Sequence, residues 1–315
     1  MRTILRRSSL LGVGLLVSML VVGCASTGAS TGSTNTPSTA DAPSPGTTAS
    51  EAEPEAADAE PKAADAYARG LEAFATGELE QAVDLLETAL ASAPDDLLVG
   101  TDYRQAVIAL ADSIDPRRGD VEAPYERALT FFEQVVADHP DAANAHLNRA
   151  FAHVDKIPSA GAITQVILAN TAVGHFTDAL EREETWLGFY SRGHAYLFWP
   201  PVFGRVDLGV ADLEKALEIA EATDNAELYT VNAWSALGDG YWRRDDVEGA
   251  RAIWQRALER FPDHPDLVKR LAFEERDALD AFLTDRFDGS RRVATHLQEI
   301  YGDRLAPWRT EDAAE

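Results

Sequence analysis

Cysteine and basic residues are both scarce in this sequence. The 315 residues include a single cysteine, so no disulfide can form within the chain and no zinc site can be built from several cysteines. Only 28 Lys and Arg stand against 53 Asp and Glu, which gives a formal net charge of −25. Because binding to nucleic acid requires clustered basic side chains, we expect no nucleic-acid partner.

Motifs of the common catalytic and cofactor sites are also missing from the body of the chain. From Ala63 onward there is no Walker loop, no G-x-S-x-G elbow, no Rossmann fingerprint and no H-E-x-x-H metal motif. His146 and His153 fall on one helical face two turns apart, a spacing that favours packing between helices over metal binding. We therefore expect no catalytic residues, no metal and no cofactor, and a function that is not enzymatic.

The first 23 residues have the pattern of a secretory signal. Three arginines, Arg2, Arg6 and Arg7, precede an apolar stretch of 13 residues from Leu10 to Val22. This stretch is too short to span a bilayer comfortably and has the usual length of a signal-peptide core.

The only cysteine, Cys24, ends this signal. Val21 stands three residues before it and Gly23 directly before it, an arrangement that resembles the lipobox of bacterial lipoproteins. The resemblance implies a diacylglyceryl group on the Cys24 thiol, acyl chains such as palmitate, and a lipid anchor in the cell envelope. Ala25 stands where an aspartate would retain such proteins at the inner membrane, which favours the periplasmic face of an outer membrane. The alternative is a short membrane anchor with an incidental cysteine.

Residues 24–62 are predicted to form a tether. After the cysteine they are mainly Ala, Ser, Thr, Gly, Pro and Glu, without aromatic residues and with no aliphatic side chain larger than alanine. Such a segment buries too little apolar surface to offset its conformational entropy. It would hold the folded body away from the membrane.

From Ala63 onward, apolar residues recur at helical spacing and the pattern repeats. The clearest unit is Val231 to His264, in which the recurring residues are Trp234, Leu237, Gly238, Tyr241, Ala250, Trp254, Ala257 and Pro262. This pattern resembles the tetratricopeptide repeat, with Trp254 at a position where phenylalanine is usual. A first unit at 63–96 has Gly70, Ala82, Leu86, Ala89 and Pro94 at the same offsets.

The resemblance implies an all-α fold, a right-handed α-solenoid of about five helical hairpins across 63–264. Residues 265–315 would supply capping helices and a short acidic tail. The small residues should let paired helices approach closely, with each glycine facing an alanine and with Leu86 and Trp254 beside them. The residues predicted to pack the repeats in this way are Gly70, Ala82, Ala89, Gly238, Ala250 and Ala257.

In tetratricopeptide-repeat proteins the first helix of each hairpin lines a groove that binds partners. Carried over to this sequence, the groove residues are Tyr67, Phe74, Asn144, Phe151, Asp155, Tyr190, His194, Asp239, Trp242 and Arg243. The alternative is that the aromatic residues among them belong to the core or to the cap. The insertion at 199–204 is predicted to pack over the next hairpin, and contact with a partner is its alternative.

These features predict a membrane-tethered, non-enzymatic scaffold of the bacterial envelope that binds another envelope protein or a peptide segment. A second reading comes from tetratricopeptide lipoproteins associated with tripartite periplasmic transporters. On that reading, the aromatic middle of the chain would line a pocket for a small solute or contact the solute-binding component of the transporter.

Overall fold

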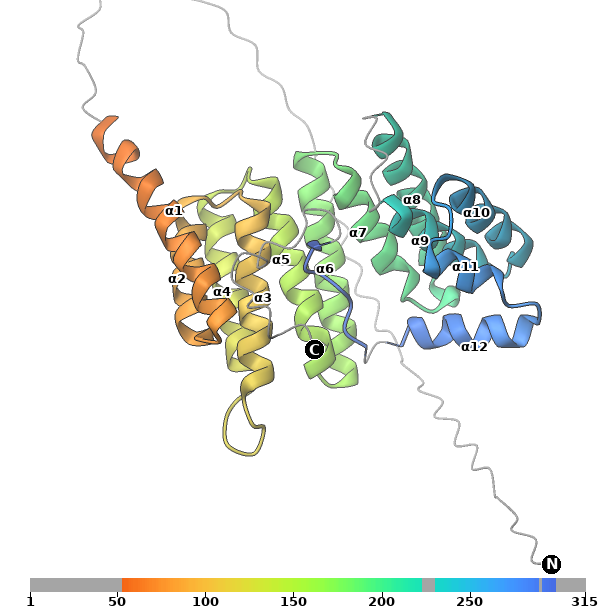
Figure 1. Cartoon of the computed structure of the whole chain (residues 1–315), viewed down its shortest axis with the longest axis horizontal. Helices are drawn as coiled ribbons and strands as arrows, with labels where there is room; N and C mark the ends of the chain where they lie inside the picture. The colour runs from red at the N-terminus through yellow and green to blue at the C-terminus, as the bar shows by residue number, and fades with distance from the viewer. Residues whose placement is uncertain (1–52, 223–229, 289–290, 299–315) are drawn as a thin grey trace, which may run out of the picture. The chain divides into compact units, whose positions relative to one another are not determined.

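The computed structural model describes residues 53–222, 230–288 and 291–298, with side chains from residue 62 onward. In these ranges the regular structure is helical, and no strand is present (Figure 1). The helices are α1 Glu53–Thr76, α2 Leu79–Ser92, α3 Leu97–Ser113, α4 Ala123–Asp138, α5 Ala143–Lys156, α6 Ala162–Arg182, α7 Trp186–Leu197, α8 Arg205–Ala222, α9 Thr230–Arg243, α10 Val247–Arg260, α11 Pro265–Leu271 and α12 Arg276–Arg286.

The helices pack as successive antiparallel hairpins. Helix α1 pairs with α2, α3 with α4, α5 with α6, α7 with α8 and α9 with α10, and the second helix of each hairpin contacts the first helix of the next (Figure 1). The all-α array of five hairpins predicted from the sequence is therefore confirmed. Two shorter helices, α11 and α12, follow the array at the expected capping positions.

The N-terminal boundary of the array differs from the expectation. Helix α1 begins at Glu53, so the last residues assigned to the tether are helical. Alanine and glutamate are abundant there, and both have high helix propensity.

The core of each hairpin contains one large apolar side chain from its second helix. These five residues are at most 1% exposed: Leu86, Phe132, Phe176, Leu213 and Trp254. A large residue recurs at this position because every hairpin leaves the same space between its two helices and the hairpin that follows, and this side chain fills it. Burying an aliphatic or aromatic side chain of this size contributes about 1.5–3 kcal/mol, so each of these positions adds substantially to the stability of the array.

The repeat glycines make room for those large side chains. A Cβ atom on Gly238 would lie 2.1 Å from Nε1 of Trp254, and one on Gly70 would lie 2.8 Å from Cγ of Leu86. The nearest atoms thus belong to the large side chains that were predicted to lie beside each glycine, and the approach of each glycine to an alanine stays a prediction. The alanines Ala82, Ala89, Ala250 and Ala257 are themselves fully or almost fully buried.

The insertion between α7 and α8 does not pack as expected. Residues Pro201–Phe203 form a short 3-10 turn whose apolar tip is solvent-exposed, with Val202 87% and Phe203 56% accessible. Only its base is packed, where the Arg205 guanidinium lies 3.8 Å from the ring centroid of Trp199. The prediction that this loop is covered by the next hairpin was wrong for its tip.

Within the described residues, none of the helices combines the length and the apolarity needed to span a bilayer. The predicted signal, Cys24 and most of the predicted tether lie outside the described residues.

Candidate binding face

The last described segment of the chain, residues 291–296, lies against the second and third hairpins. Arg104 on α3 donates a hydrogen bond of 3.0 Å from Nη2 to the main-chain oxygen of Thr295. The Thr295 hydroxyl donates in turn to the carboxylate of Asp155 on α5. We use the name inner face for the side chains of α3, α5, α7 and α9 that contact this segment or line the pocket beside it.

A second contact fixes the same segment three residues earlier. Arg292 donates from Nη2 to Oδ1 of Asp112 at 2.9 Å and from Nη1 to the Tyr125 hydroxyl at 3.2 Å. Burial raises the pKa of Tyr125, so its hydroxyl stays protonated near neutral pH. Together, the contacts of Arg292 and Thr295 hold a short extended stretch by its side chains and its main chain.

Arg104 is the centre of a buried polar network. Its side chain is 1% exposed and forms an ion pair of 2.7 Å between Nη1 and Oδ2 of Asp155, which is 3% exposed. Its Nε donates to Oδ1 of Asn148 at 3.1 Å, and its guanidinium lies 4.8 Å from the ring centroid of Phe151. Because a buried guanidinium is costly unless its N–H groups are paired, the contact with the Thr295 carbonyl is part of what makes this burial possible.

Close packing of α3 on α5 depends on Gly100. A Cβ atom at this position would lie 2.2 Å from Nδ2 of Asn148. The absence of a side chain lets Asn148 reach Arg104 and accept its hydrogen bond. The network is thus positioned by a glycine that the sequence pattern did not single out.

Beside residues 291–294 the inner face contains a pocket of about 280 Å³, built from α7, α9, α11 and α12. Its aromatic side chains are Tyr190, His194, Phe198 and Phe287, and its basic side chains are Arg270, Arg286, Arg291 and Arg292. Ser235 also lines it, and its buried Oγ has no hydrogen-bond partner among the described residues.

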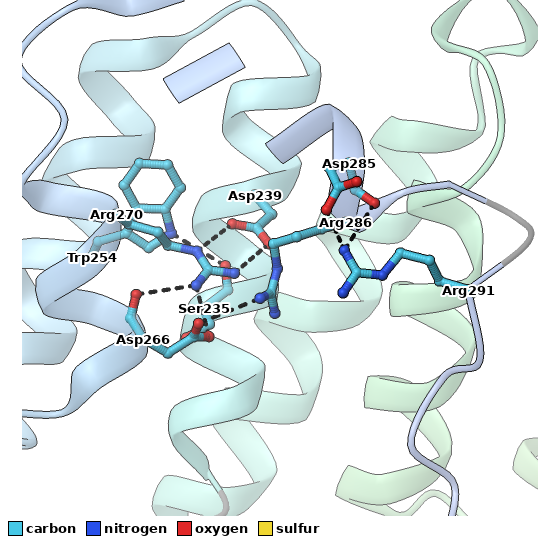
Figure 2. Close-up of polar contacts among 8 residues, drawn as sticks. All are labelled: Ser235, Asp239, Trp254, Asp266, Arg270, Asp285, Arg286 and Arg291. Atoms are coloured by element: carbon cyan, nitrogen blue, oxygen red, sulfur yellow. Dashed lines mark hydrogen bonds and ion pairs between the residues drawn. The ribbon is translucent and has the colours of Figure 1, made fainter. Parts of the chain in front are cut away.

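An ion cluster forms one wall of this pocket (Figure 2). Arg270 donates to both carboxylate oxygens of Asp239, each at 2.8 Å, and its Nη1 lies 2.7 Å from Oδ2 of Asp266. Figure 2 also shows Arg286 beside Asp266, at 3.4 Å. Burial raises the pKa of Asp239, and the charge and hydrogen bonds of Arg270 oppose that shift. The bidentate geometry is the form in which an arginine and a carboxylate attract most strongly.

His194 lies in the aromatic part of the pocket. Its ring stacks on Tyr190 with centroids 5.7 Å apart and meets the edge of Phe198 at 5.4 Å. Burial, and then the positive charges of Arg286 and Arg270, lower the pKa of His194 to about 4. The imidazole is therefore neutral at neutral pH.

The predicted groove residues fall into three groups. Asp155 contacts Thr295, and Tyr190 and His194 line the pocket, so these three lie on the inner face, whereas Phe151 lies behind it against the Arg104 guanidinium. Tyr67 and Phe74 on α1 pack against the first hydrophobic core, where the Tyr67 hydroxyl donates to Asp102 at 2.7 Å. Asn144 binds Asp95 near the start of α5, through its main-chain nitrogen at 2.7 Å and its amide at 3.1 Å.

The third group comes from α9 and is engaged within the chain. Asp239 is buried in the ion pair with Arg270. Trp242 donates from Nε1 to Oδ1 of Asp280 on α12 at 2.7 Å, and Arg243 donates to the main-chain oxygen of Trp199 at 2.6 Å. Asp239 and Trp242 thus contact the cap, and Arg243 contacts the insertion between α7 and α8; that a partner binds at these three positions stays a prediction.

Three residues of this region were missed from the sequence: Arg104 on the inner face, Arg270 on α11 in the pocket wall, and Thr295 in the segment itself. One signal was available: Asp102 and Arg104 are charged residues within an otherwise largely apolar helix, α3. Charged side chains on a buried helix need partners, which points to a polar network. The position of Thr295 carried no such signal, because it lies 191 residues from Arg104 in the sequence.

Comparisons with known proteins agree with the repeat assignment at the C-terminal hairpin. A family profile described as tetratricopeptide repeat matches residues 231–273, which span α9, α10 and α11. No curated protein matches the chain.

Solved structures of similar fold are tetratricopeptide-repeat and related proteins. A thermophilic tetratricopeptide-repeat protein from Thermus thermophilus is 22% identical with a TM-score of 0.46, over 67% of this chain and 97% of that one. MamA from Desulfovibrio magneticus is 17% identical with a TM-score of 0.42, over 65% and 97%. YrrB, described as a tetratricopeptide-repeat protein with an unusual peptide-binding site, is 15% identical with a TM-score of 0.40, over 70% and 97%. The chain is thus an all-α array of helical hairpins with a tetratricopeptide repeat at residues 231–273.

Proposed function

We propose that this protein is a non-enzymatic interaction scaffold, tethered to a membrane of the bacterial envelope, whose inner face binds an extended peptide segment of a protein partner. One observation carries the proposal: Arg104 and Asp155 bind a main-chain oxygen and a hydroxyl of an extended segment. Main-chain recognition of this kind suits any extended peptide, and side-chain contacts then select among sequences.

The segment at 291–296 indicates what such a peptide would contain. Asp155 accepts a hydrogen bond from a hydroxyl, which favours threonine or serine at one position. Asp112 and Tyr125 bind an arginine three residues earlier. In this interpretation the chain's own segment occupies the face until a partner segment with an Arg-x-x-Thr pattern takes its place. The acidic side chains would also favour a basic partner.

A peptide titration tests this function. A labelled peptide with the sequence of residues 289–298 would be added to a variant carrying Arg292→Glu and Thr295→Ala, in which the internal segment has lost its main contacts. We expect the peptide to bind this variant saturably. It should bind the wild-type chain at least about tenfold more weakly, which is about 1.4 kcal/mol, because the chain's own segment competes for the face.

Two controls make the result specific. The same peptide with alanine in place of its arginine and threonine should bind at least about tenfold more weakly. Asp112→Asn in the protein, at an exposed position, should weaken binding of the unaltered peptide without changing the melting temperature. Equal binding of a scrambled peptide would show that the face does not recognise extended segments in this way.

The tether rests on the lipobox pattern around Cys24, which predicts an acylated N-terminal cysteine after signal cleavage. Burial of each acyl CH₂ contributes about 0.8 kcal/mol, so two or three chains would hold the protein on a membrane. Wild-type protein should partition into detergent and carry acyl chains on Cys24. Cys24→Ser should be unlipidated. A wild-type protein without acyl chains would remove membrane tethering from the proposal and leave the peptide-binding face untouched.

The pocket beside the segment favours a second candidate function, solute binding in association with a tripartite periplasmic transporter. Its aromatic side chains suit a solute with an apolar part, and its four arginines, each paired with an aspartate in this structure, would offer further N–H donors to a small carboxylate. A melting screen of aromatic and aliphatic carboxylates tests it. A ligand that raises the melting temperature of the wild type, but not of Arg286→Gln, would favour the solute function, whereas a screen without such a ligand would favour the scaffold.

A further inference from the structure

Two histidines and an aspartate meet in the third hairpin, away from the inner-face contacts described above. His146 lies on α5, and His175 and Asp178 lie one turn apart on α6. Nδ1 of His175 is 3.1 Å from Oδ2 of Asp178, and Nδ1 of His146 is 3.9 Å from the same oxygen. One potential ligand atom from each of the three residues lies within 4.8 Å of the other two.

These separations fit a single ion. Bonds of 2.0–2.2 Å at tetrahedral angles place the ligand atoms of a zinc ion about 3.3–3.6 Å from one another. The distances of 3.1 and 3.9 Å bracket that range. The separation of the two histidine nitrogens is within 4.8 Å, so side-chain rotations would need to close it by up to about 1.2 Å, and zinc would replace the hydrogen bond between His175 and Asp178.

The orientation of His146 supports a ligand role. Its Nε2 lies 3.1 Å from the main-chain oxygen of Pro140, and a carbonyl oxygen can only accept, so Nε2 carries the proton. Nδ1 is then left with a lone pair, and it is buried without a hydrogen-bond partner among the described residues. Metal-binding histidines commonly have one ring nitrogen bonded to a carbonyl in this way while the other faces the ion.

The donor types select the ion. Two imidazole nitrogens and one carboxylate oxygen suit zinc, whereas calcium and magnesium prefer shells made of oxygen. The Asp178 side chain is 43% exposed, so a fourth position, filled by water, would face solvent.

Two arginines near the cluster limit its affinity. Arg182 donates to the main-chain oxygens of Pro140 and Asp178, and Arg149 lies 3.9 Å from Glu133. Their positive charge opposes a second cation, so the site should be weaker than a structural zinc site.

We propose that His146, His175 and Asp178 form a zinc site that links α5 to α6. Three features define the site. The lone pair of His146 has no partner in the described part of the chain, a histidine and a carboxylate lie within reach of it, and a fourth coordination position faces solvent. No part of this inference depends on peptide binding at the inner face.

The test is direct metal binding by the untagged chain, from residue 25 onward, after treatment with a chelator. Zinc affinity would be measured by competition with a chromogenic chelator, and geometry by the visible absorption of cobalt in the same site. We expect one zinc per chain, a tetrahedral cobalt spectrum and a higher melting temperature with zinc.

Variants separate this site from binding elsewhere. Asp178→Asn, at a half-exposed position, and His175→Gln should each weaken zinc binding at least about tenfold, which is about 1.4 kcal/mol. His264→Gln, in the loop after α10, is the matched control and should bind as the wild type does. Melting without metal checks that each variant is folded. Wild-type affinity in both site variants, an equal loss in His264→Gln, or absence of stoichiometric zinc would overturn the proposal.

Discussion

Arg270 and Asp239 form a bidentate ion pair in which both hydrogen bonds are 2.8 Å long and both side chains are at most 4% exposed. The pair links α11 to α9, so the first capping helix is attached to the last hairpin by a buried charge pair. The Arg270 guanidinium also lies 5.9 Å from the ring centroid of Trp254, the large core residue of that hairpin.

Removing one member of this pair should be strongly destabilising. Asp239→Asn leaves the guanidinium without its bidentate partner in a buried site, and we expect a loss of about 3–5 kcal/mol in the free energy of unfolding. Urea denaturation measures it. Arg276→Ala breaks the exposed contact with Asp245 and should leave the same quantity nearly unchanged. Similar losses in the two variants would mean that burial does not set the contribution of this pair.

Glycine substitutions test the fit between paired helices. Gly238→Ala places a Cβ atom 2.1 Å from Nε1 of Trp254, so the indole ring or α9 must move, and a loss of about 1–3 kcal/mol is expected. Gly174, in the middle of α6, has open space around it. Gly174→Ala should therefore stabilise the protein by up to about 1 kcal/mol, through helix propensity alone. Thermal melts of both variants give the comparison, and a silent Gly238→Ala would contradict the observed packing.

The sequence predicted the hairpins because each one repeats the same local chemistry. Small residues such as Gly238 and Ala250 occur at fixed offsets from a large core residue such as Trp254, and proline follows the second helix. These signals lie within a single hairpin, so the pattern in one chain is sufficient to find them. The same reasoning predicted a partner groove that includes Asp155, Tyr190 and His194, which lie at the segment 291–296 or at the pocket beside it, and binding of a partner there stays a prediction.

Contacts between distant segments left no comparable signal. Arg104 binds Thr295 because the C-terminal segment passes back across the inner face. The periodicity of neither segment indicates this contact. The cluster of His146, His175 and Asp178 also depends on the packing of α5 on α6. The contact of Trp242 with α12 left no signal either, because the repeat pattern describes hairpins but does not show what packs on them.

Acidification should destabilise the fold through His194. Burial and nearby arginines lower its pKa from the ordinary 6.5 to about 4, so between these values the unfolded chain binds a proton that the folded chain does not. Stability therefore falls as the pH drops from about 6.5 towards 4, by up to about 1.4 kcal/mol per pH unit from this group. His194→Gln should show a shallower dependence in urea titrations at pH 7 and pH 5. An unchanged difference between the two pH values would show that His194 does not contribute.

Trp242 should stabilise the cap. Because residues 291–296 follow α12 in the chain, it should also stabilise the state in which this segment lies on the inner face. Its indole donates to Asp280 at 2.7 Å and stacks on Phe287, with centroids 6.1 Å apart. Trp242→Ala removes both contacts with α12, and we expect a loss of about 1–3 kcal/mol because the side chain is only partly buried. Trp242→Phe keeps the stacking and should lose about 1.5 kcal/mol, the lower end of the range for a hydrogen bond to a charged group.

The same substitution should affect the segment that follows α12. Once α12 is loosened, residues 291–296 are held less firmly, so Trp242→Ala should be cleaved faster by trypsin after Arg291 or Arg292 than the wild type. Phe203→Ala, at the exposed loop tip, serves as the control and should leave both stability and cleavage rate nearly unchanged. If Trp242→Ala melted at the wild-type temperature and were cleaved at the wild-type rate, its contacts with α12 would not hold the cap. The tryptophan would then be available for a partner, as the repeat pattern first suggested.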